Sequence, residues 1–238
     1  MSKQLIIVLN GKGGVGKSFF ATNLVQYLKD RNLPHHPIDT DNENSTLKRY
    51  HGEADFIDLN DPRGLDLMFA AVEKSPCVVI DGRAASTDLI LDYFAEVSAF
   101  DLLEGMDARL TLVIPINHEA DSVTQAKLIS DTLETRCRYV IVRNQAHSEH
   151  FGIYEKSRTR SRLIDEFHAS ELVMPKMYDW LVTGLNQHNL TTTEAQRHAA
   201  FNIVDRQRLK NWQKLFYTEL DAHREALLGE PQPTASDE

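Results

Sequence analysis

Runs of apolar residues alternate with amphipathic segments along almost the whole chain. Short apolar runs are typical of strands buried on both faces of a sheet, and apolar positions three or four residues apart are typical of helices. The runs that predict strands are 3–9, 36–41, 77–81, 110–115, 139–144 and 172–175. The segments that predict helices are 19–28, 87–98, 121–133 and 204–228, while 44–72 is less regular and is expected to include helical turns. This alternation predicts an α/β fold: a three-layer, doubly wound and mostly parallel sheet.

The last predicted helix carries one apolar stripe, which we expect to pack on the sheet of the same domain rather than on a membrane or a partner. The residues of this stripe are Leu209, Trp212, Phe216 and Leu220. Beyond Leu228 the chain has almost no apolar residues and ends in acidic ones. We therefore expect residues 1–228 to form a single domain and residues 229–238 to form a disordered acidic tail.

Composition is that of an ordinary globular protein. The chain has 238 residues, of which 42% are hydrophobic and 26% charged, and this suits one α/β domain with a full core. No run approaches the ~18 apolar residues that span a bilayer. The first strand is predicted within a few residues of Met1, which leaves no room for a signal peptide. We expect a cytoplasmic protein.

The two cysteines, Cys77 and Cys137, each stand at the head of a predicted strand. Isolated cysteines at such positions are typically small buried residues. No CxxC pair occurs in the chain, and this counts against an iron–sulfur carrier.

The most informative segment lies between the first predicted strand and the first predicted helix. Residues 11–18 read Gly-Lys-Gly-Gly-Val-Gly-Lys-Ser and match the phosphate-loop pattern GxxxxGK[ST]. In such a loop backbone N–H groups surround a polyphosphate, the lysine (Lys17) contacts the β- and γ-phosphates, and the hydroxyl (Ser18) is a ligand of Mg²⁺. The following helix adds the positive end of its dipole. A glycine-rich turn with incidental lysines is the alternative, but the strand before and the helix after favour a nucleoside-triphosphate site.

Lys12 stands at the front of this loop, where an ordinary phosphate loop needs no lysine. The spacing Lys-Gly-Gly-x-Gly-Lys-[Ser/Thr] resembles the deviant Walker A family, which includes ParA, MinD and the nitrogenase iron protein. The resemblance implies that Lys12 reaches across a dimer interface to the nucleotide of the other subunit, and therefore an ATP-dependent homodimer. An exposed lysine on a loop is the other interpretation.

Asp81 closes the apolar strand 77–81, as a Walker B aspartate does. At this place it would hold Mg²⁺ through water, opposite Ser18. An aspartate that caps a helix is the alternative.

Asp39 and Asp41 end another predicted strand as Asp-Thr-Asp. This resembles the Asp-x-Asp motif of ParA-like proteins, in which an Asn-x-Thr element follows, here residues 44–46. The resemblance implies that Asp41 orients the attacking water and that Asp39 helps to order the magnesium shell. Phosphoryl transfer agrees with such roles, because it depends on positioning and charge more than on covalent chemistry.

Three positions depart from the family pattern. Asn42 and Glu43 stand where proline and glutamine are usual, and Phe19 replaces a second Ser/Thr that contacts the α-phosphate. Only the backbone N–H of Phe19 is therefore available to the nucleotide. We expect nucleotide binding to persist and hydrolysis to be slow.

Two later positions are candidates for the adenine contact. Relatives use an asparagine after a late strand and a Pro-containing loop after the last strand, and Asn144 and Pro175 fall there. An asparagine at a strand end is also an ordinary turn residue.

The residues expected to bind ATP are Gly11, Lys12, Gly13, Gly14, Val15, Gly16, Lys17, Ser18, Phe19, Asn144 and Pro175. Those expected at Mg²⁺ are Ser18, Asp39 and Asp81, and those expected to act in catalysis are Lys12, Lys17 and Asp41.

The formal net charge of −9 argues against a surface that is basic overall. One local cluster alternates basic with small polar residues: Lys156, Arg158, Arg160 and Arg162. A solvated loop is one interpretation, and non-specific contact with DNA or docking of a protein partner are the others. The acidic end of the chain differs from the basic amphipathic helix of MinD-type proteins, so we expect no membrane binding.

The pattern over the whole chain resembles the TraL group of conjugative plasmids. The resemblance rests on residues 38–46, Ile-Asp-Thr-Asp-x-x-Asn-x-Thr, on the single Ser18, and on 206–210, Arg-Gln-Arg-Leu-Lys. It implies an ATPase dimerisation switch in plasmid partition or conjugative DNA transfer, with a protein partner from that machinery. The alternatives are a nucleotide-binding regulator or scaffold that barely hydrolyses ATP, and an ATP-dependent metabolic synthase of the same fold, a class that generally lacks the front lysine.

Overall fold

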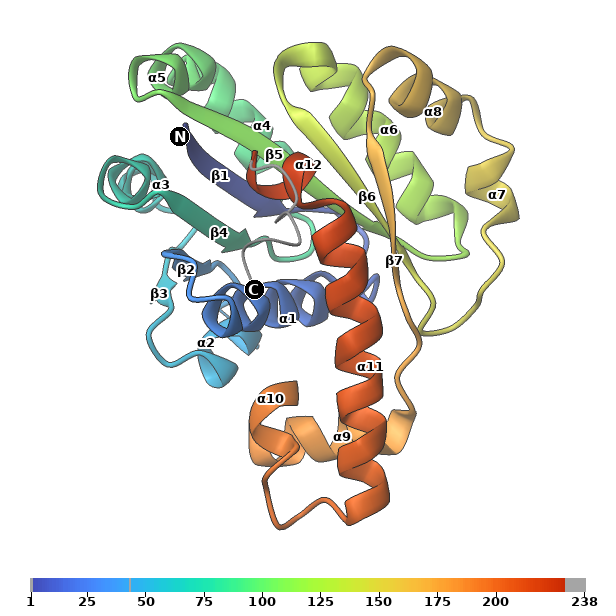
Figure 1. Ribbon diagram of the computed structural model, residues 1–238. Helices are drawn as coiled ribbons and strands as arrows, with labels where there is room; N and C mark the ends of the chain where they lie inside the picture. The colour runs from blue at the N-terminus through green and yellow to red at the C-terminus, as the bar shows by residue number, and fades with distance from the viewer. Residues whose placement is uncertain (1, 43, 230–238) are drawn as a thin grey trace, which may run out of the picture.

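A parallel β-sheet lies at the centre of the computed structural model, which describes residues 2–42 and 44–229 (Figure 1). Over this range its strands are β1 (Lys3–Val8), β2 (His36–Asp39), β3 (Asp55–Phe56), β4 (Cys77–Asp81), β5 (Ala108–Ile116), β6 (Arg138–Asn144) and β7 (Ser170–Met174). They lie in the order β3-β2-β4-β1-β5-β6-β7, and each neighbouring pair is parallel. The predicted parallel α/β sheet is therefore confirmed.

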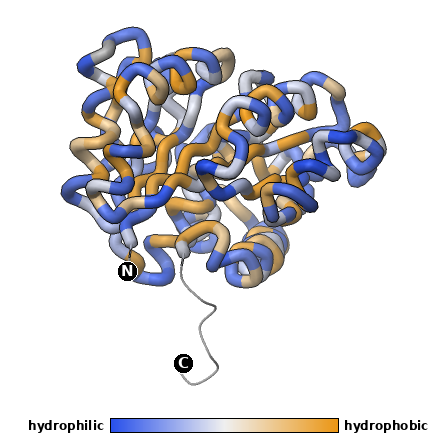
Figure 2. The backbone as a smooth tube through the Cα atoms, turned by 90° about the horizontal axis from the view of Figure 1, so that it is seen from above, coloured by the Kyte–Doolittle hydropathy of each residue, from blue (hydrophilic) through white to orange (hydrophobic). Residues whose placement is uncertain are grey.

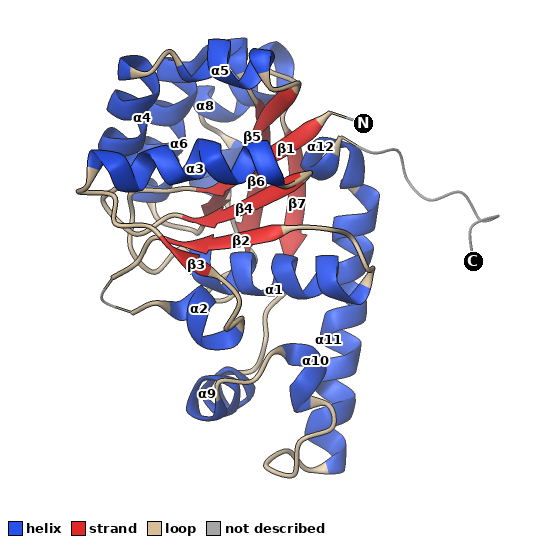
Figure 3. Cartoon of the chain, turned by 90° about the vertical axis from the view of Figure 1, so that its left-hand side faces the viewer, coloured by secondary structure: helices blue, strands red, loops and turns tan. Residues whose placement is uncertain are grey.

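Helices cover both faces of this sheet (Figures 1 and 3). On one face lie α1 (Lys17–Asp30), α2 (Thr46–Tyr50), α9 (Asp179–His188), α10 (Thr192–Ala195), α11 (Ile203–Ala222) and α12 (Arg224–Leu228). On the other lie α3 (Pro62–Lys74), α4 (Thr87–Glu96), α5 (Ala99–Gly105), α6 (Ala120–Leu133), α7 (Gly152–Glu155) and α8 (Arg158–Ser161), with a 3₁₀ turn η1 (Glu134–Arg136) and a π turn η2 (Arg162–Glu166).

The core consists of two apolar layers, one on each face of the sheet. Successive strand residues point to opposite faces, so Leu5 and Ile7 enter one layer while Ile6 and Val8 enter the other. Figure 2 shows that the hydrophobic segments gather in the strands at the centre of the molecule. This two-sided burial explains why the strands read as continuous apolar runs.

The predicted apolar stripe of the last helix is confirmed as a core face. Leu209, Trp212, Phe216 and Leu220 are all buried in the layer that also holds Phe20 of α1. The predicted single helix 204–228 is wrong in detail, because it breaks at His223 into α11 and α12.

The structure differs from the pattern at two further places. The predicted strand 36–41 ends at Asp39, because the Asp39 carboxylate accepts the N–H of Asp41 and turns the chain. The irregular stretch 44–72 contains α2, β3 and most of α3. Both residues of β3 are exposed at the edge of the sheet, so no apolar run marks them.

The two cysteines differ in their burial. Cys77 is buried as expected and Cys137 is half-buried, and burial raises the pKa of the Cys137 thiol to about 12. In the part of the chain that the structure describes, no helix is long and apolar enough to cross a membrane. The expected acidic tail lies outside the described residues from position 230 on, and one domain over 1–228 stays a prediction.

Candidate nucleotide site

The loop between β1 and α1 crosses the carboxyl edge of the sheet. Val8 and Asp81 are partners in the register of β1 and β4, so this loop lies beside the end of β4. Gly14 and Gly16 have φ of +75° and +96°, a left-handed conformation that glycine adopts without strain. A Cβ on Gly16 would also stand 2.3 Å from Nδ2 of Asn144. Glycine at positions 14 and 16 is therefore required by the backbone geometry of the loop.

Lys17 begins α1 and its ammonium lies against the loop. The side chain is buried, and Nζ donates a hydrogen bond of 3.0 Å to the carbonyl of Lys12. Burial lowers the pKa of Lys17, while the charges of Asp81 and Asp41 oppose that shift. Helix α1 starts without a side-chain cap, so its first N–H groups remain available to an anion. A cation and free donors thus meet where a phosphate would bind.

Asp81 ends β4 next to this loop, and its carboxylate is buried. Within the described residues neither carboxylate oxygen has a hydrogen-bond partner. Burial raises the pKa of Asp81 to about 7, and the nearby Ser18 hydroxyl and Lys17 ammonium counter only part of that rise. Unpartnered buried oxygens are the donor atoms that a divalent cation would satisfy.

The described residues contain no group of three or more His, Cys, Asp or Glu side chains that could hold a metal ion by themselves. Mg²⁺ needs no such group, because it keeps several waters and takes phosphate oxygens together with one or two protein ligands. Ser18 and Asp81 therefore fit a magnesium ion that arrives with a nucleotide.

Asp39 lies fully buried at the end of β2, and its oxygens accept backbone hydrogen bonds. Oδ1 accepts the N–H of Asp41 at 2.9 Å, and Oδ2 accepts the N–H of Lys48 at 2.9 Å. Burial raises the pKa of Asp39, and these N–H groups oppose the rise. In the structure Asp39 orders the loop after β2, and its expected contact with magnesium stays a prediction.

Asp41 lies in that loop. Its charge opposes the lowering of the Lys17 pKa by burial and adds to the rise of the Asp81 pKa that burial causes. Its carboxylate accepts the backbone N–H of Asn44 at 3.1 Å and the Asn44 side-chain amide at 3.2 Å. Glu43 lies outside the described residues. Asp41 thus belongs to the charged cluster at the phosphate loop, and its role toward water stays a prediction.

Lys12 extends from the loop to the turn between β5 and α6. Its Nζ lies 3.2 Å from Oε2 of Glu119 and 3.6 Å from Oδ2 of Asp121. These carboxylates, chiefly Glu119, raise the pKa of Lys12. The Lys12 side chain is 34% exposed at the rim of the site. Sequence reasoning identified Lys12 but neither of its partners, which are remote in the chain.

Asn10, which sequence reasoning also missed, fixes the start of the loop. It is fully buried; its Nδ2 donates to the carbonyls of Pro115 (2.8 Å) and Ser122 (3.1 Å), and its Oδ1 accepts the N–H of Lys12 (3.0 Å). The only signal in the sequence was its position, because it is a polar residue between the apolar run 3–9 and the phosphate loop. Asn10 therefore ties Lys12 to the same turn that holds its ammonium.

The two residues expected at the adenine are engaged with the protein. Asn144 is buried, and its Nδ2 donates to the carbonyl of Val15 at 2.9 Å, supporting the phosphate loop. The carbonyl of Pro175 accepts the indole N–H of Trp212 at 2.8 Å. The Phe19 ring contacts the same indole edge-on, with centroids 5.5 Å apart. Contact of Asn144 or Pro175 with a base stays a prediction.

The basic cluster is partly neutralised within the chain. Arg160 binds Glu171 through two hydrogen bonds of 3.0 and 2.7 Å, and Arg162 binds Asp131 and Glu166. Lys156 and Arg158 form no ion pair with any carboxylate that the structure describes. Half of the cluster therefore holds α8 and η2 in place, and DNA contact stays a prediction.

Two known proteins resemble this chain over most of its length. Protein TraL of Escherichia coli is 27% identical over 239 residues, covering 92% of this chain and 97% of the relative. Protein MobD of Acidithiobacillus ferrooxidans is 25% identical over 218 residues, covering 89% and 94%.

Two solved structures share the fold. The MinD cell division protein of Aquifex aeolicus superposes with a TM-score of 0.53 at 15% identity, covering 98% of this chain and 99% of that one. The septum site-determining protein MinD of Pyrococcus horikoshii OT3, complexed with Mg-ADP, gives 0.55 at 15% identity, covering 93% and 96%. Residues 6–211 match the family described as the CobQ/CobB/MinD/ParA nucleotide binding domain. Because this match spans most of the sequence, the chain belongs to the CobQ/CobB/MinD/ParA nucleotide binding domain family.

Proposed function

We propose that the protein is a Mg²⁺-dependent ATPase that dimerises when it binds ATP and that acts in conjugative transfer, mobilisation or partition of plasmid DNA. One observation carries the proposal: the Lys17 ammonium, the Ser18 hydroxyl and the unpartnered Asp81 carboxylate meet at one edge of the sheet, with Lys12 at its rim. The sequence relatives TraL and MobD align over nearly the whole chain and support the role in transfer or mobilisation.

ATP would bind with its phosphates in the loop 11–16. Lys17 would exchange its hydrogen bond to the Lys12 carbonyl for one to the β- or γ-phosphate, and the N-terminus of α1 would donate N–H groups. Ser18 and Asp81 would hold the magnesium ion, which neutralises charge that develops on the phosphates. Asn144 already supports the loop, because its side-chain amide donates a hydrogen bond to the Val15 carbonyl.

Dimerisation would involve Lys12. Glu119 and Asp121 hold its ammonium at the rim, outside the contacts that Lys17 makes. An exposed ion pair of this kind contributes little to stability. The γ-phosphate of ATP on a second subunit would therefore compete well for Lys12.

Hydrolysis would use Asp41 to orient water, at a low rate. Asn44 donates one hydrogen bond to each Asp41 oxygen, which fixes the carboxylate and leaves each oxygen a further lone pair for a water. The departures from the family pattern at Phe19, Asn42 and Glu43 favour a second candidate: a nucleotide-dependent regulator whose ATP-bound state persists because hydrolysis is very slow.

Light scattering after size-exclusion chromatography, with and without Mg-ATP, tests the proposal. Lys12→Ala should bind ATP as a monomer, Lys17→Ala should lose ATP binding, and Asp41→Ala should accumulate the ATP-bound dimer. Lys156→Ala, an exposed lysine away from the loop, is the matched control and should behave as wild type. Unchanged ATP affinity in Lys17→Ala would show the loop assignment to be wrong, and an ATP-dependent dimer of Lys12→Ala would remove Lys12 from the interface.

A further inference from the structure

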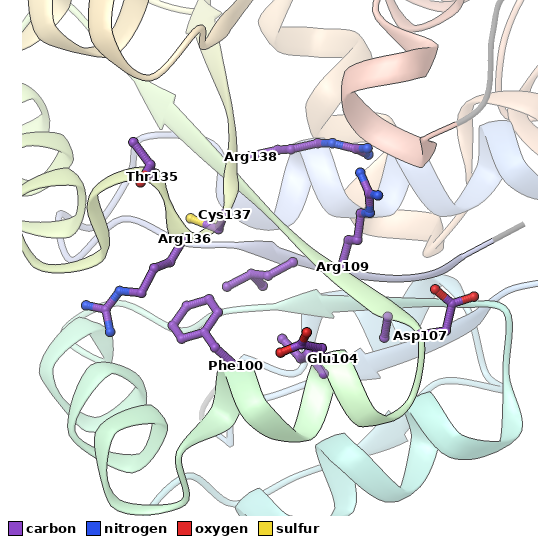
Figure 4. Close-up of a pocket in the computed structure, with 11 residues that line it drawn as sticks. Phe100, Glu104, Asp107, Arg109, Thr135, Arg136, Cys137 and Arg138 are labelled. Carbon is purple, nitrogen blue, oxygen red and sulfur yellow. The ribbon is translucent and has the colours of Figure 1, made fainter.

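A hollow of about 500 Å³ opens at the edge of the sheet opposite the phosphate loop, at the amino ends of β5 and β6 (Figure 4). Phe100, Leu103 and Leu110 give it an apolar wall. Arg109 and Arg138 bring two guanidinium groups to it. None of the residues considered for nucleotide binding lines this hollow.

The strand register brings the two arginines together. Arg138 is the partner of Thr111 across β5 and β6, and Arg109 lies two positions before Thr111, on the same face of β5. Figure 4 shows the guanidinium groups directed toward each other. Among the described residues neither forms an ion pair with a carboxylate. Arg138 Nη1 donates a long hydrogen bond of 3.5 Å to the backbone carbonyl of Glu225.

Two like charges held together cost free energy unless an anion lies near them. Burial, and then the charge of Arg109, lower the pKa of Arg138, while the charge of Glu225 opposes this shift. Arg136, a third arginine of the hollow, is satisfied differently: it donates to the carbonyls of Leu133 and Thr132 and lies over the Phe100 ring. Arg109 and Arg138 thus form a pair of guanidinium groups that has no ion pair with any carboxylate in the described part of the chain, although the charge of Glu225 acts on Arg138.

We propose that Arg109 and Arg138 form a binding site for the phosphate group of a small soluble ligand. Each planar guanidinium presents a fork of N–H donors that matches two oxygens of an oxyanion. One carboxylate satisfies one fork, whereas a phosphate has enough oxygens for both. Glu104 and Asp107 lie across the hollow and would accept hydrogen bonds from hydroxyl or amine groups of the ligand.

An acidic segment of the same chain is the competing source of an anion. A Cβ placed on Gly229 would stand 3.0 Å from Nη1 of Arg138. Residues 230–238, which follow directly, include three acidic residues and no basic one. The test must therefore separate a free phosphate from carboxylates of this segment.

Calorimetric titration with pyrophosphate at constant ionic strength makes this test. The full chain carrying Lys17→Ala serves as background, so that the phosphate loop does not contribute, and wild type saturated with Mg-ADP repeats the measurement without that substitution. Arg109→Gln and Arg138→Gln should each weaken binding about tenfold or more, because each removes charge-assisted hydrogen bonds. Arg197→Gln, which removes one exposed positive charge elsewhere, should leave the affinity unchanged.

A thermal scan without ligand adds a readout that a purely structural role would not give. Arg109→Gln relieves the repulsion, so its midpoint should equal or exceed that of wild type even though it loses pyrophosphate binding. Absence of pyrophosphate binding in the Lys17→Ala background would overturn the proposal. So would arginine variants that bind pyrophosphate as tightly as the same background with both arginines intact. Binding seen only when the chain ends at Gly229 would also overturn it and assign the arginines to residues 230–238.

Discussion

At the scale of single residues, two carboxylates of the same subunit hold the Lys12 ammonium. This ion pair should compete with formation of the ATP-bound dimer. If Lys12 must leave Glu119 to reach a partner's nucleotide, Glu119→Gln should favour the ATP-bound dimer. The ATP concentration at half-dimerisation should fall about two- to fivefold, the range expected for a weak exposed ion pair. Analytical ultracentrifugation at several ATP concentrations measures it.

Glu155→Gln is the matched control for this prediction. Glu155 also forms an exposed ion pair, with Arg143 at 2.6 Å, away from the phosphate loop. It should leave the dimer equilibrium unchanged. Loss of the dimer in Glu119→Gln would instead show that Glu119 itself contributes to the interface.

His51 is a fully buried histidine whose neutral form the structure stabilises. Its Nε2–H donates to the carbonyl of Thr22 at 2.9 Å, and its Nδ1 accepts from Nζ of Lys29 at 3.1 Å. Burial lowers the pKa of His51 to about 4. The unfolded chain therefore binds a proton more readily than the folded one, and stability is lost as the pH falls from the ordinary histidine pKa toward 4.

The contribution lost over this range is about 3 kcal/mol. Denaturant unfolding at a series of pH values should show a smaller loss of stability on acidification for His51→Gln than for wild type. The exposed His147 provides a control, because His147→Gln should keep the wild-type slope. The raised pKa of Asp81 gives the opposite pH dependence, but it is common to all three proteins and cancels in the comparison. An unchanged slope in His51→Gln would contradict the prediction.

At the scale of elements, an aromatic contact joins the phosphate loop to α11. Phe19, in the first turn of α1, packs edge-on against Trp212, and Trp212 stacks on Phe216 at 5.2 Å. Phe19→Leu keeps apolar bulk but loses the ring pair, so the free energy of unfolding should fall by about 0.5–1.5 kcal/mol. ATP affinity should change little, because only the backbone N–H at this position faces a phosphate.

Denaturant unfolding and an ATP titration of Phe19→Leu check the two halves of this prediction. Phe56→Leu is the control, since Phe56 lies 39% exposed on the edge strand β3, and its effect should stay within about 0.5 kcal/mol. A large loss of ATP affinity in Phe19→Leu would mean that the ring itself shapes the nucleotide site.

The elements that the sequence predicted best are those buried on both sides. β1, β4, β5 and β6 read as apolar runs because both faces of the central sheet are covered. β3 escaped prediction because its two residues are exposed. Helical turns were expected within 44–72, but the pattern there did not give the bounds of α3. The break at His223 has no sequence signal, since the apolar stripe itself ends at Leu220.

In the candidate site, too, some residues could be predicted from the sequence and others could not. Local motifs predicted the phosphate loop, Ser18 and Asp81, because each residue type is required at a fixed distance from a strand end. The partners that hold these residues could not be predicted. Asn10 meets Pro115 and Lys12 meets Glu119 only because β1 and β5 are neighbours. The pair Arg109 and Arg138 likewise depends on the register of β5 and β6.

At the scale of the whole molecule, the net charge of −9 means that DNA contact requires a local patch. Within the basic cluster, Arg160 and Arg162 serve ion pairs to Glu171 and Asp131, so only Lys156 and Arg158 remain for phosphates. If the ATP-bound dimer holds duplex DNA through this cluster, Lys156→Glu with Arg158→Glu should abolish binding. Lys156→Gln with Arg158→Gln should lower the slope of log affinity against log salt by about 1.8 per subunit, the value for two lost phosphate contacts.

Fluorescence anisotropy with a random duplex, over a series of salt concentrations and with or without Mg-ATP, measures both effects. Arg160→Gln is the informative control, because it breaks the bidentate contact with Glu171 and should lower the thermal midpoint while DNA affinity stays the same. Salt-dependent binding that survives the double charge reversal would move the DNA surface to another part of the molecule. Absence of any binding in the ATP-bound state would favour a transfer factor that is docked on a protein, since an acidic chain without a DNA surface can reach plasmid DNA only through a partner.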